Sequence, residues 1–241
     1  MARHFLVLAL VLLPGCAEVK PGFRPEEAPW SRDTSTPPPR GQLRVTLKMF
    51  EVAAKDRAAL QGVAQFAAPE IAVAGAPALE DHGIRVMAGR PSLATSLEVE
   101  LRRARAASVR NSFMVFLPGE EARIEVFQGA PVEGPVSVPL YKDRVKTGAA
   151  EIEAEAAGFL AKFKKLPRGI LEMHLTPWFR TPSGKERLLE AAGADLVIDP
   201  RRPYAFFAKQ EETESLGSVL LSRGSGLSRR FILLVITVEE P

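Results

Sequence analysis

Hydrophobic and polar residues alternate with a period of two over much of the chain, starting at Leu43. In the segment 43–52, LRVTLKMFEV, the apolar side chains of Val45, Leu47 and Met49 are separated by polar ones. Because successive side chains of a strand point to opposite faces, this pattern predicts a strand with one covered face. The further segments that predict strands are 84–89, 109–132 with a turn at Pro118-Gly119, 168–179, 194–200, 204–208 and 229–240.

Helical patterns are fewer. Residues Ala53–Phe66 are rich in alanine and charged residues and could form a short helix. In Ser92–Ala107 three leucines recur every four residues and arginines gather near the end, as in an amphipathic helix with cations at the negative end of its dipole. Residues 135–165 are ambiguous, with Glu151–Ala157 locally prone to helix. The expected fold class is therefore α+β, mainly β, with one or two short helices.

The last strand has a different pattern. From Phe231 to Val238 only Thr237 interrupts a run of apolar residues. A strand with one face in water would alternate, so this run predicts a strand covered on both faces. Either a closed ring of chains supplies this cover, or a helix of the same chain lies over the strand, for which Ser92–Ala107 is the candidate.

The extreme N-terminus has the pattern of an export signal. A basic start at Arg3 precedes nine apolar residues, Phe5–Leu13, which are too few to cross a bilayer as a helix. The sequence Leu13-Pro14-Gly15-Cys16 resembles the bacterial lipobox, which implies cleavage before Cys16, lipidation of its thiol and acylation of its new amine by a fatty acid such as palmitate. The alternative is an ordinary secretory signal with an incidental cysteine.

Three parts of the chain follow from this pattern: a signal peptide over 1–15, the lipidated Cys16 with a proline-rich tether over 16–42, and one β domain over 43–241. The tether contains six prolines, which favour extended polyproline geometry over a packed core. Ala17 follows the cysteine, and by resemblance to lipoprotein sorting this implies an outer-membrane anchor facing the periplasm.

Composition excludes several classes of protein. The chain has 46% hydrophobic and 25% charged residues, as in a folded domain, and its net charge of +3 gives no case for nucleic-acid binding. A single cysteine excludes a disulfide scaffold. No cluster of residues has the spacing of metal ligands, and no cofactor is expected. The basic runs at 102–105 and 162–165 indicate solvated helix faces, with contacts to acidic lipid as the alternative.

Catalysis has little support in the sequence. Outside the signal there are two histidines, His82 and His174. His174 falls on the polar face of a predicted strand, where a solvated or cross-strand-paired histidine is the expectation. No serine lies in a nucleophile elbow, and SRGSG at 222–226 lacks the rest of a phosphate loop. We therefore expect a protein that is not an enzyme.

The order of four segments resembles the core domain of the secretins, the ring-forming outer-membrane channels of type II and type III secretion and of type IV pili. The first is the strand VTLKMFEV at 45–52, which ends in Glu51 and Val52. The second resembles the secretin pattern G-x-x-A-x-I-x-V-G-x-x-x-P, with the second glycine placed late. Its matching residues are Gly119, Ala122, Ile124, Val126, Gly129 and Pro131. The third is LEMHLTP, ending in Pro177, and the fourth is ILLVITVEEP at 232–241, close to the terminal secretin strand.

This resemblance covers residues 43–241 and implies a structural role. The glycine-rich steps that secretins have before their last strand are not found in residues 204–231, and only the tether precedes the core. The leading hypothesis is a shortened, ring-forming channel component of a secretion or pilus system in the outer membrane. The alternative is a monomeric envelope lipoprotein that binds a secretin or pilus protein through its sheet. In both, Cys16 contacts membrane lipid.

Overall fold

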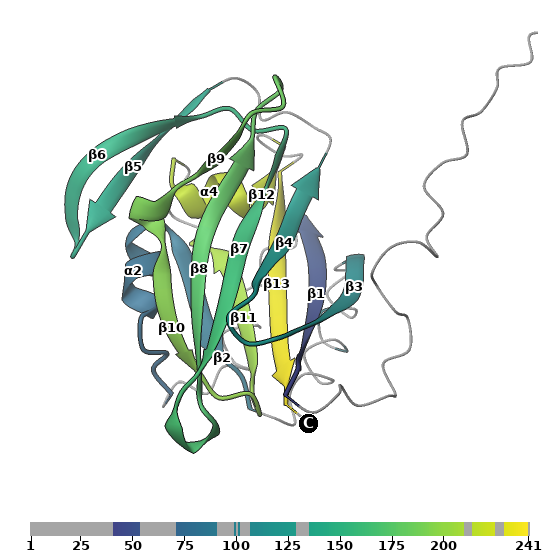
Figure 1. Ribbon diagram of the computed structural model, residues 1–241. Coiled ribbons are helices and arrows are strands. Elements are labelled where there is room, and N and C mark those ends of the chain that lie inside the picture. Colours follow the sequence, from purple (N-terminus) through teal and green to yellow (C-terminus); the bar gives the residue numbers. More distant parts are fainter. Residues whose placement is uncertain are drawn as a thin grey trace, which may run out of the picture.

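The computed structural model describes residues 41–53, 71–90, 99, 101, 107–128, 135–209, 214–224 and 229–240. Within these residues the protein is α+β and mainly β (Figure 1). Cys16, the tether up to residue 40, most of the helix predicted over 53–66, and Gly129 and Pro131 lie outside them.

The first sheet contains both ends of the β domain. In the described part its strands lie in the order β2-β11-β13-β1-β3, with the short β12 paired to β13, and all neighbours are antiparallel. The bounds are β1 Leu43–Ala53, β2 Ile84–Ala88, β3 Ala107–Phe116, β11 Pro203–Ala208, β12 Ser222–Arg223 and β13 Arg230–Glu239.

The second sheet is formed by the middle of the chain. Its described strands lie in the order β10-β8-β7-β4, with β9 paired to β8. The bounds are β4 Glu121–Gln128, β7 Ala156–Lys165, β8 Leu171–Arg180, β9 Glu186–Leu188 and β10 Ala194–Ile198.

The remaining described elements are a hairpin and four short helices. The strands β5 and β6 pair only with each other there, and Figure 1 shows this hairpin curving away beside the two sheets. The bounds are β5 Val136–Lys142, β6 Val145–Ile152, α2 Ala76–Asp81, α4 Leu216–Leu220 and the single 3-10 turns η3 Pro167–Gly169 and η4 Glu190–Ala192.

The two sheets pack face to face around what we call the inner core. Side chains of β1 and β13, such as Val45 and Leu234, share it with Phe159 of β7 and Met173 of β8. The rings of Phe159 and Phe206 lie 6.5 Å apart across the two layers. The alternating residues that predict a covered face, Val45, Leu47 and Met49, are all buried in this core.

The outer face of the first sheet carries a second buried set, which we call the outer cluster. It consists of Phe50, Val52, Leu101, Ala205, Phe207, Phe231, Leu233 and Val235. Since β13 also contributes Ile232, Leu234 and Ile236 to the inner core, the prediction that this strand is covered on both faces is confirmed. Leu101 belongs to the segment predicted to be a covering helix, and Leu101 itself is helical, while most of that segment lies outside the described residues.

Some expectations about local structure are wrong. The helix predicted over Ser92–Ala107 cannot include its last residue, because Ala107 begins β3 and pairs with Glu51. The segment Glu151–Ala157 is not helical, since β6 ends at Ile152 and β7 begins at Ala156. Burial of Ile152 and Ala156 against the sheets outweighs the local preference for helix.

The basic run at 162–165 is also placed differently from the expectation. It lies at the end of β7 and not on a helix, with Lys162, Lys164 and Lys165 exposed and Phe163 buried between them. The prediction of strand, turn and strand over 109–132 is confirmed for the described residues. However, β3 and β4 belong to different sheets, so the Pro118-Gly119 turn connects the two layers.

Candidate functional site

The motif residues of the predicted secretin-like core are structural where the structure describes them. Ala122, Ile124 and Val126 lie on β4 and are buried in the inner core. Gly119 has a φ of 96°, which favours glycine, and its amide donates a hydrogen bond to the carbonyl oxygen of Phe163. Pro177 is buried within β8. These residues shape the sandwich and do not gather into one site.

Glu51 is the one charged member of this motif, and it is almost buried. Its carboxylate lies 3.3 Å from the guanidinium of Arg223 and 3.2 Å from that of Arg230. These ion pairs join β1 to β12 and β13 in the first sheet. Glu51 therefore neutralises two cations near the end of β1. This structural role is enough to explain a carboxylate at this position, and a catalytic role is not needed.

A polar relay lies on the outward face of the second sheet. The Nδ1 atom of His174 is 2.6 Å from Oδ1 of Asp195, which is opposite it on β10, and its Nε2 atom is 3.0 Å from the hydroxyl oxygen of Thr176. The expectation of a cross-strand-paired histidine is confirmed. If Nδ1–H donates to Asp195, Nε2 is left to accept the Thr176 proton, which is the order of groups in a hydroxyl-activating triad.

The surroundings of this relay do not favour catalysis. The side chains of His174 and Asp195 are 48% and 64% exposed, whereas Thr176 is buried. None of the three cavities described for the molecule includes any of the three residues. A catalytic site usually holds its substrate in a cleft that excludes water, and the relay lines none of these three. The relay is therefore best explained as a pairing that stabilises β8 against β10.

His82 is buried and acts as a connector. Its Nδ1 atom donates to the carbonyl oxygen of Ala78 at 2.9 Å, and its Nε2 atom accepts the amide hydrogen of Tyr141 at 3.1 Å. Its own carbonyl oxygen accepts from Gly217. This one residue thus joins α2 to the β5–β6 hairpin and to α4, and both ring nitrogens are used.

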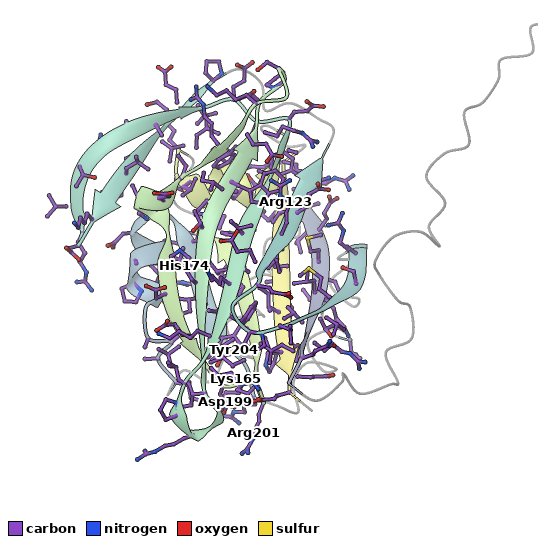
Figure 2. All side chains as sticks on the ribbon, in the orientation of Figure 1. Arg123, Lys165, His174, Asp199, Arg201 and Tyr204 are labelled. Atoms are coloured by element: carbon purple, nitrogen blue, oxygen red, sulfur yellow. The ribbon has the colours of Figure 1, made fainter. Side chains whose placement is uncertain are left out.

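A cleft of about 640 Å³ lies at one end of the sandwich. We call it the end cleft. Its lining comes from the β7–β8 turn, the β10–β11 loop and the C-terminal end of β13, with charged and apolar residues mixed. Figure 2 shows four labelled side chains gathered at this end, and Arg123 and His174 further along the second sheet. The four are Lys165, Asp199, Arg201 and Tyr204.

Tyr204 forms a buried wall of the end cleft. Its hydroxyl oxygen accepts the amide hydrogen of Asp199 at 2.6 Å. Burial raises the pKa of Tyr204 above its ordinary value of 10.0, and the hydrogen bond from Asp199 partly opposes this rise. The phenol therefore stays protonated at neutral pH, and its hydroxyl donates no hydrogen bond to a described residue.

The described residues contain neither a membrane-spanning helix nor a metal site. None of the described helices has the length and apolar character needed to span a membrane. No group of three or more His, Cys, Asp or Glu side chains in that part of the chain could hold a metal ion.

Comparison with known proteins adds no relative. No family model matches the chain, and neither a curated protein nor a solved structure is similar to it at a significant level. The secretin relationship is therefore a hypothesis that depends on the residues quoted above.

Sequence reasoning missed the end cleft and the partners of His174. Both are formed by residues far apart in the chain, such as Arg168 and Arg201 or His174 and Asp195. The signals available were weak: a basic Arg201-Arg202 pair after Asp199-Pro200, and one polar residue on each of two predicted strands. Only the register of the sheets shows which of them meet.

Proposed function

We propose that the protein is a lipid-anchored lipoprotein of the outer membrane, facing the periplasm, that folds as a monomer and binds a component of a secretion or pilus system. The choice of a monomer depends on one observation: both faces of β13 are buried within a single chain. Leu233 is fully buried and packs with Leu101 and Phe50 of the same chain in the outer cluster. A strand that one chain covers on both faces does not need neighbouring subunits or lipid.

A surface for the partner is available on the β5–β6 hairpin. Within the described residues β6 is hydrogen-bonded only to β5, and seven of its eight residues are not buried, including Val145 at 64% exposure. An extended segment of another protein can add to such an edge through main-chain hydrogen bonds. This supports binding of a partner through a sheet. The proposal includes no enzymatic chemistry, no cofactor and no nucleic acid.

The anchor is tested directly through Cys16. Metabolic labelling with a fatty-acid analogue should label the wild-type protein, because the residues before Cys16 resemble a lipobox. Cys16→Ser should lose the label and either leave the membrane fraction or remain uncleaved, since no thiol is left to receive the lipid. The anchor is wrong if the wild-type protein carries no label.

A second candidate is a ring-forming channel component, which the order of secretin-like segments favours. These segments lie on β1, β4, β8 and β13 in the order along the chain that the resemblance implies. The mass of the wild-type protein in mild detergent separates the two. A monomer without residues 1–15 runs somewhat below the 26.2 kDa of the full chain plus its detergent, whereas a ring of about a dozen chains is roughly ten times larger.

A further inference from the structure

The end cleft lies where the N-terminal part of the chain enters the sandwich. Arg44, at the start of β1, is paired in register with Glu239, and its guanidinium lies 3.6 Å from that carboxylate. Glu239 lines the end cleft. Residues 1–42 therefore join the domain at the end that carries the cleft, and Figure 1 shows the C-terminus at this end as well.

The charges at this end do not cancel. Each carboxylate that lines the cleft already has a cation beside it. The pairs are Asp199 with Arg202 at 3.4 Å, Glu239 with Arg44, and Glu240 with Lys165. The other two arginines of the lining, Arg168 and Arg201, have no side-chain hydrogen bond or ion pair to any described residue. When Arg44 and Lys165, which pair with lining carboxylates from outside the lining, are counted, this end has five cations and three carboxylates, an excess of two positive charges.

The backbone of Arg168, one of these two cations, has an unfavourable conformation. Arg168 has a φ of 68°, in the left-handed region that disfavours side chains with a Cβ, and it is followed by Gly169 at 71°. Such a conformation costs of the order of 1 kcal/mol or more and persists where the surroundings hold it. Here the residue held in this conformation is exposed and lines the cleft.

The lining also offers apolar surface and a buried donor. Ile71, Ile170 and Val197 contribute to the wall, and Val197 is 39% exposed. The protonated phenol of Tyr204 lies among them with its hydrogen unused by described residues. Two guanidinium groups, one hydroxyl donor and apolar walls match an anion that is attached to something apolar.

We propose that the end cleft binds the phosphate of an anionic lipid headgroup, so that the end of the domain where the tether enters lies against the membrane surface. This inference depends on the proposed lipid anchor, which holds the entry end near the bilayer. The apolar wall and the position at the tether favour a lipid over a soluble anion. The second contact would add to the binding by the acyl chains.

The test measures binding of the full chain to vesicles. All variants carry Cys16→Ser, so that no acyl chain contributes, and vesicles of phosphatidylcholine with and without phosphatidylglycerol are compared at low ionic strength. Binding through residues 1–15 is common to all variants and is measured on the neutral vesicles. A double change, Arg168→Ala with Arg201→Ala, should weaken binding to the anionic vesicles about 25-fold, because each arginine near such a surface contributes about fivefold.

The matched control removes the same charge elsewhere. Arg144 is also an exposed arginine in a turn with a φ of 68°, and Arg187 lies on β9; neither lines the end cleft. Arg144→Ala with Arg187→Ala should change binding less than twofold. Circular dichroism and the urea midpoint should be equal in both double variants, which excludes loss of fold.

Three outcomes decide the matter. A large loss for the cleft variant alone supports the proposal. Equal losses in both variants overturn it, because net charge would then explain the binding. Full displacement by inorganic phosphate at a concentration matching the lipid phosphate would also overturn it, in favour of a soluble anion site. The Cys16 labelling experiment is independent: a labelled protein without cleft-dependent binding keeps the anchor and loses this inference.

Discussion

At the scale of single residues, Arg123 connects three strands of the second sheet at one point. Its guanidinium lies 4.2 Å from the ring centre of Trp178 and donates to Glu186, with Nη1 and Oε1 3.0 Å apart. Arg123 belongs to β4, Trp178 to β8 and Glu186 to β9. Trp178 is fully buried although it points to the outer face, so Arg123 and its partner serve as its cover.

Replacing Arg123 should therefore loosen this corner. Arg123→Ala removes the cation from the ring and should lower the free energy of unfolding by about 1 kcal/mol through that contact. The emission of Trp178 should also shift to longer wavelength, because water reaches the indole. Arg123→Lys is the control. It keeps the charge but cannot form the bidentate hydrogen bond through which Nη1 and Nη2 of Arg123 donate to Glu186, and it should give a smaller shift in emission. An unchanged spectrum in the alanine variant would contradict the covering role.

The same contact should depend on pH in a defined direction. The hydrogen bond from Arg123 is the main cause that lowers the pKa of Glu186 below its ordinary value of 4.5. A carboxyl with a lowered folded-state pKa stabilises the protein above its unfolded-state pKa, and this contribution is lost as the pH falls through the folded-state value. The stability difference between wild type and Glu186→Gln should thus be present at neutral pH and vanish in acid.

The inner core gives a stronger test at one position. Ile124 is fully buried on β4, in the same cluster as Val45 and Met49. Ile124→Asp places an unpaired carboxyl there and should cost about 4 kcal/mol or more, whereas Ile124→Val should cost about 1 kcal/mol. Urea unfolding measures both, and soluble yield replaces it if the first variant does not fold. Equal midpoints for wild type and Ile124→Asp would show that this face is not a core.

Predictions about single residues succeeded where the period of the hydrophobic pattern alone determines which side chains are buried. The alternation in β1 predicted that Val45, Leu47 and Met49 share a covered face, and all three are buried. The same reasoning placed His174 on a polar face but could not name Asp195 or Thr176 as its neighbours. Neighbours across strands depend on register, and register is set by the whole sheet and its turns.

At the scale of elements, two strand glycines have opposite surroundings. A Cβ on Gly158 of β7 would lie 1.9 Å from the carbonyl oxygen of Ile124, beside the irregularity in the β4–β7 pairing. A Cβ on Gly148 of β6 would meet nothing within 4 Å. The first glycine is thus required for the close approach of two strands, and the second is not.

Alanine at these two positions should therefore act in opposite directions. Gly158→Ala should cost about 3 kcal/mol, because backbone must move to admit the methyl group. Gly148→Ala should be neutral or stabilise by up to about 1 kcal/mol, since it only restricts the unfolded chain. Thermal and urea unfolding of the two variants measure this difference. If both variants unfold alike, the contact between β7 and β4 is looser than described.

Element types were largely predictable, whereas their assignment to sheets was not. The strands at 43–52, 84–89 and 229–240 follow from local patterns because burial imposes a period on each. The Pro118-Gly119 turn was also predicted, but nothing local indicates that it connects two layers instead of forming a hairpin. The local preference for helix at Glu151–Ala157 fails for a related reason, since tertiary burial overrides it.

At the scale of the whole molecule, the burial of β13 provides a test between the two proposed functions. Leu233 lies in its middle, fully buried in the outer cluster, and Leu101 is buried beside it. In a ring, this face would meet neighbouring subunits or lipid, and a charge there would separate the chains without unfolding each one. In a monomer that covers its own strand, the same charge has no solvent to reach and must disrupt the fold.

The variant Leu233→Arg distinguishes these cases when mass and stability are measured together. For the proposed monomer, the wild type should run as a single chain in mild detergent, and Leu233→Arg should lose several kcal/mol of stability or fail to accumulate. Leu101→Asp should have a similar effect, because it reaches the same cluster from the covering segment. Thr237→Arg is the control on the same strand, since Thr237 points to the same outward side but is only partly buried. A wild-type oligomer near ten times the monomer mass, which Leu233→Arg converts into folded single chains, would reject the monomer and establish the ring.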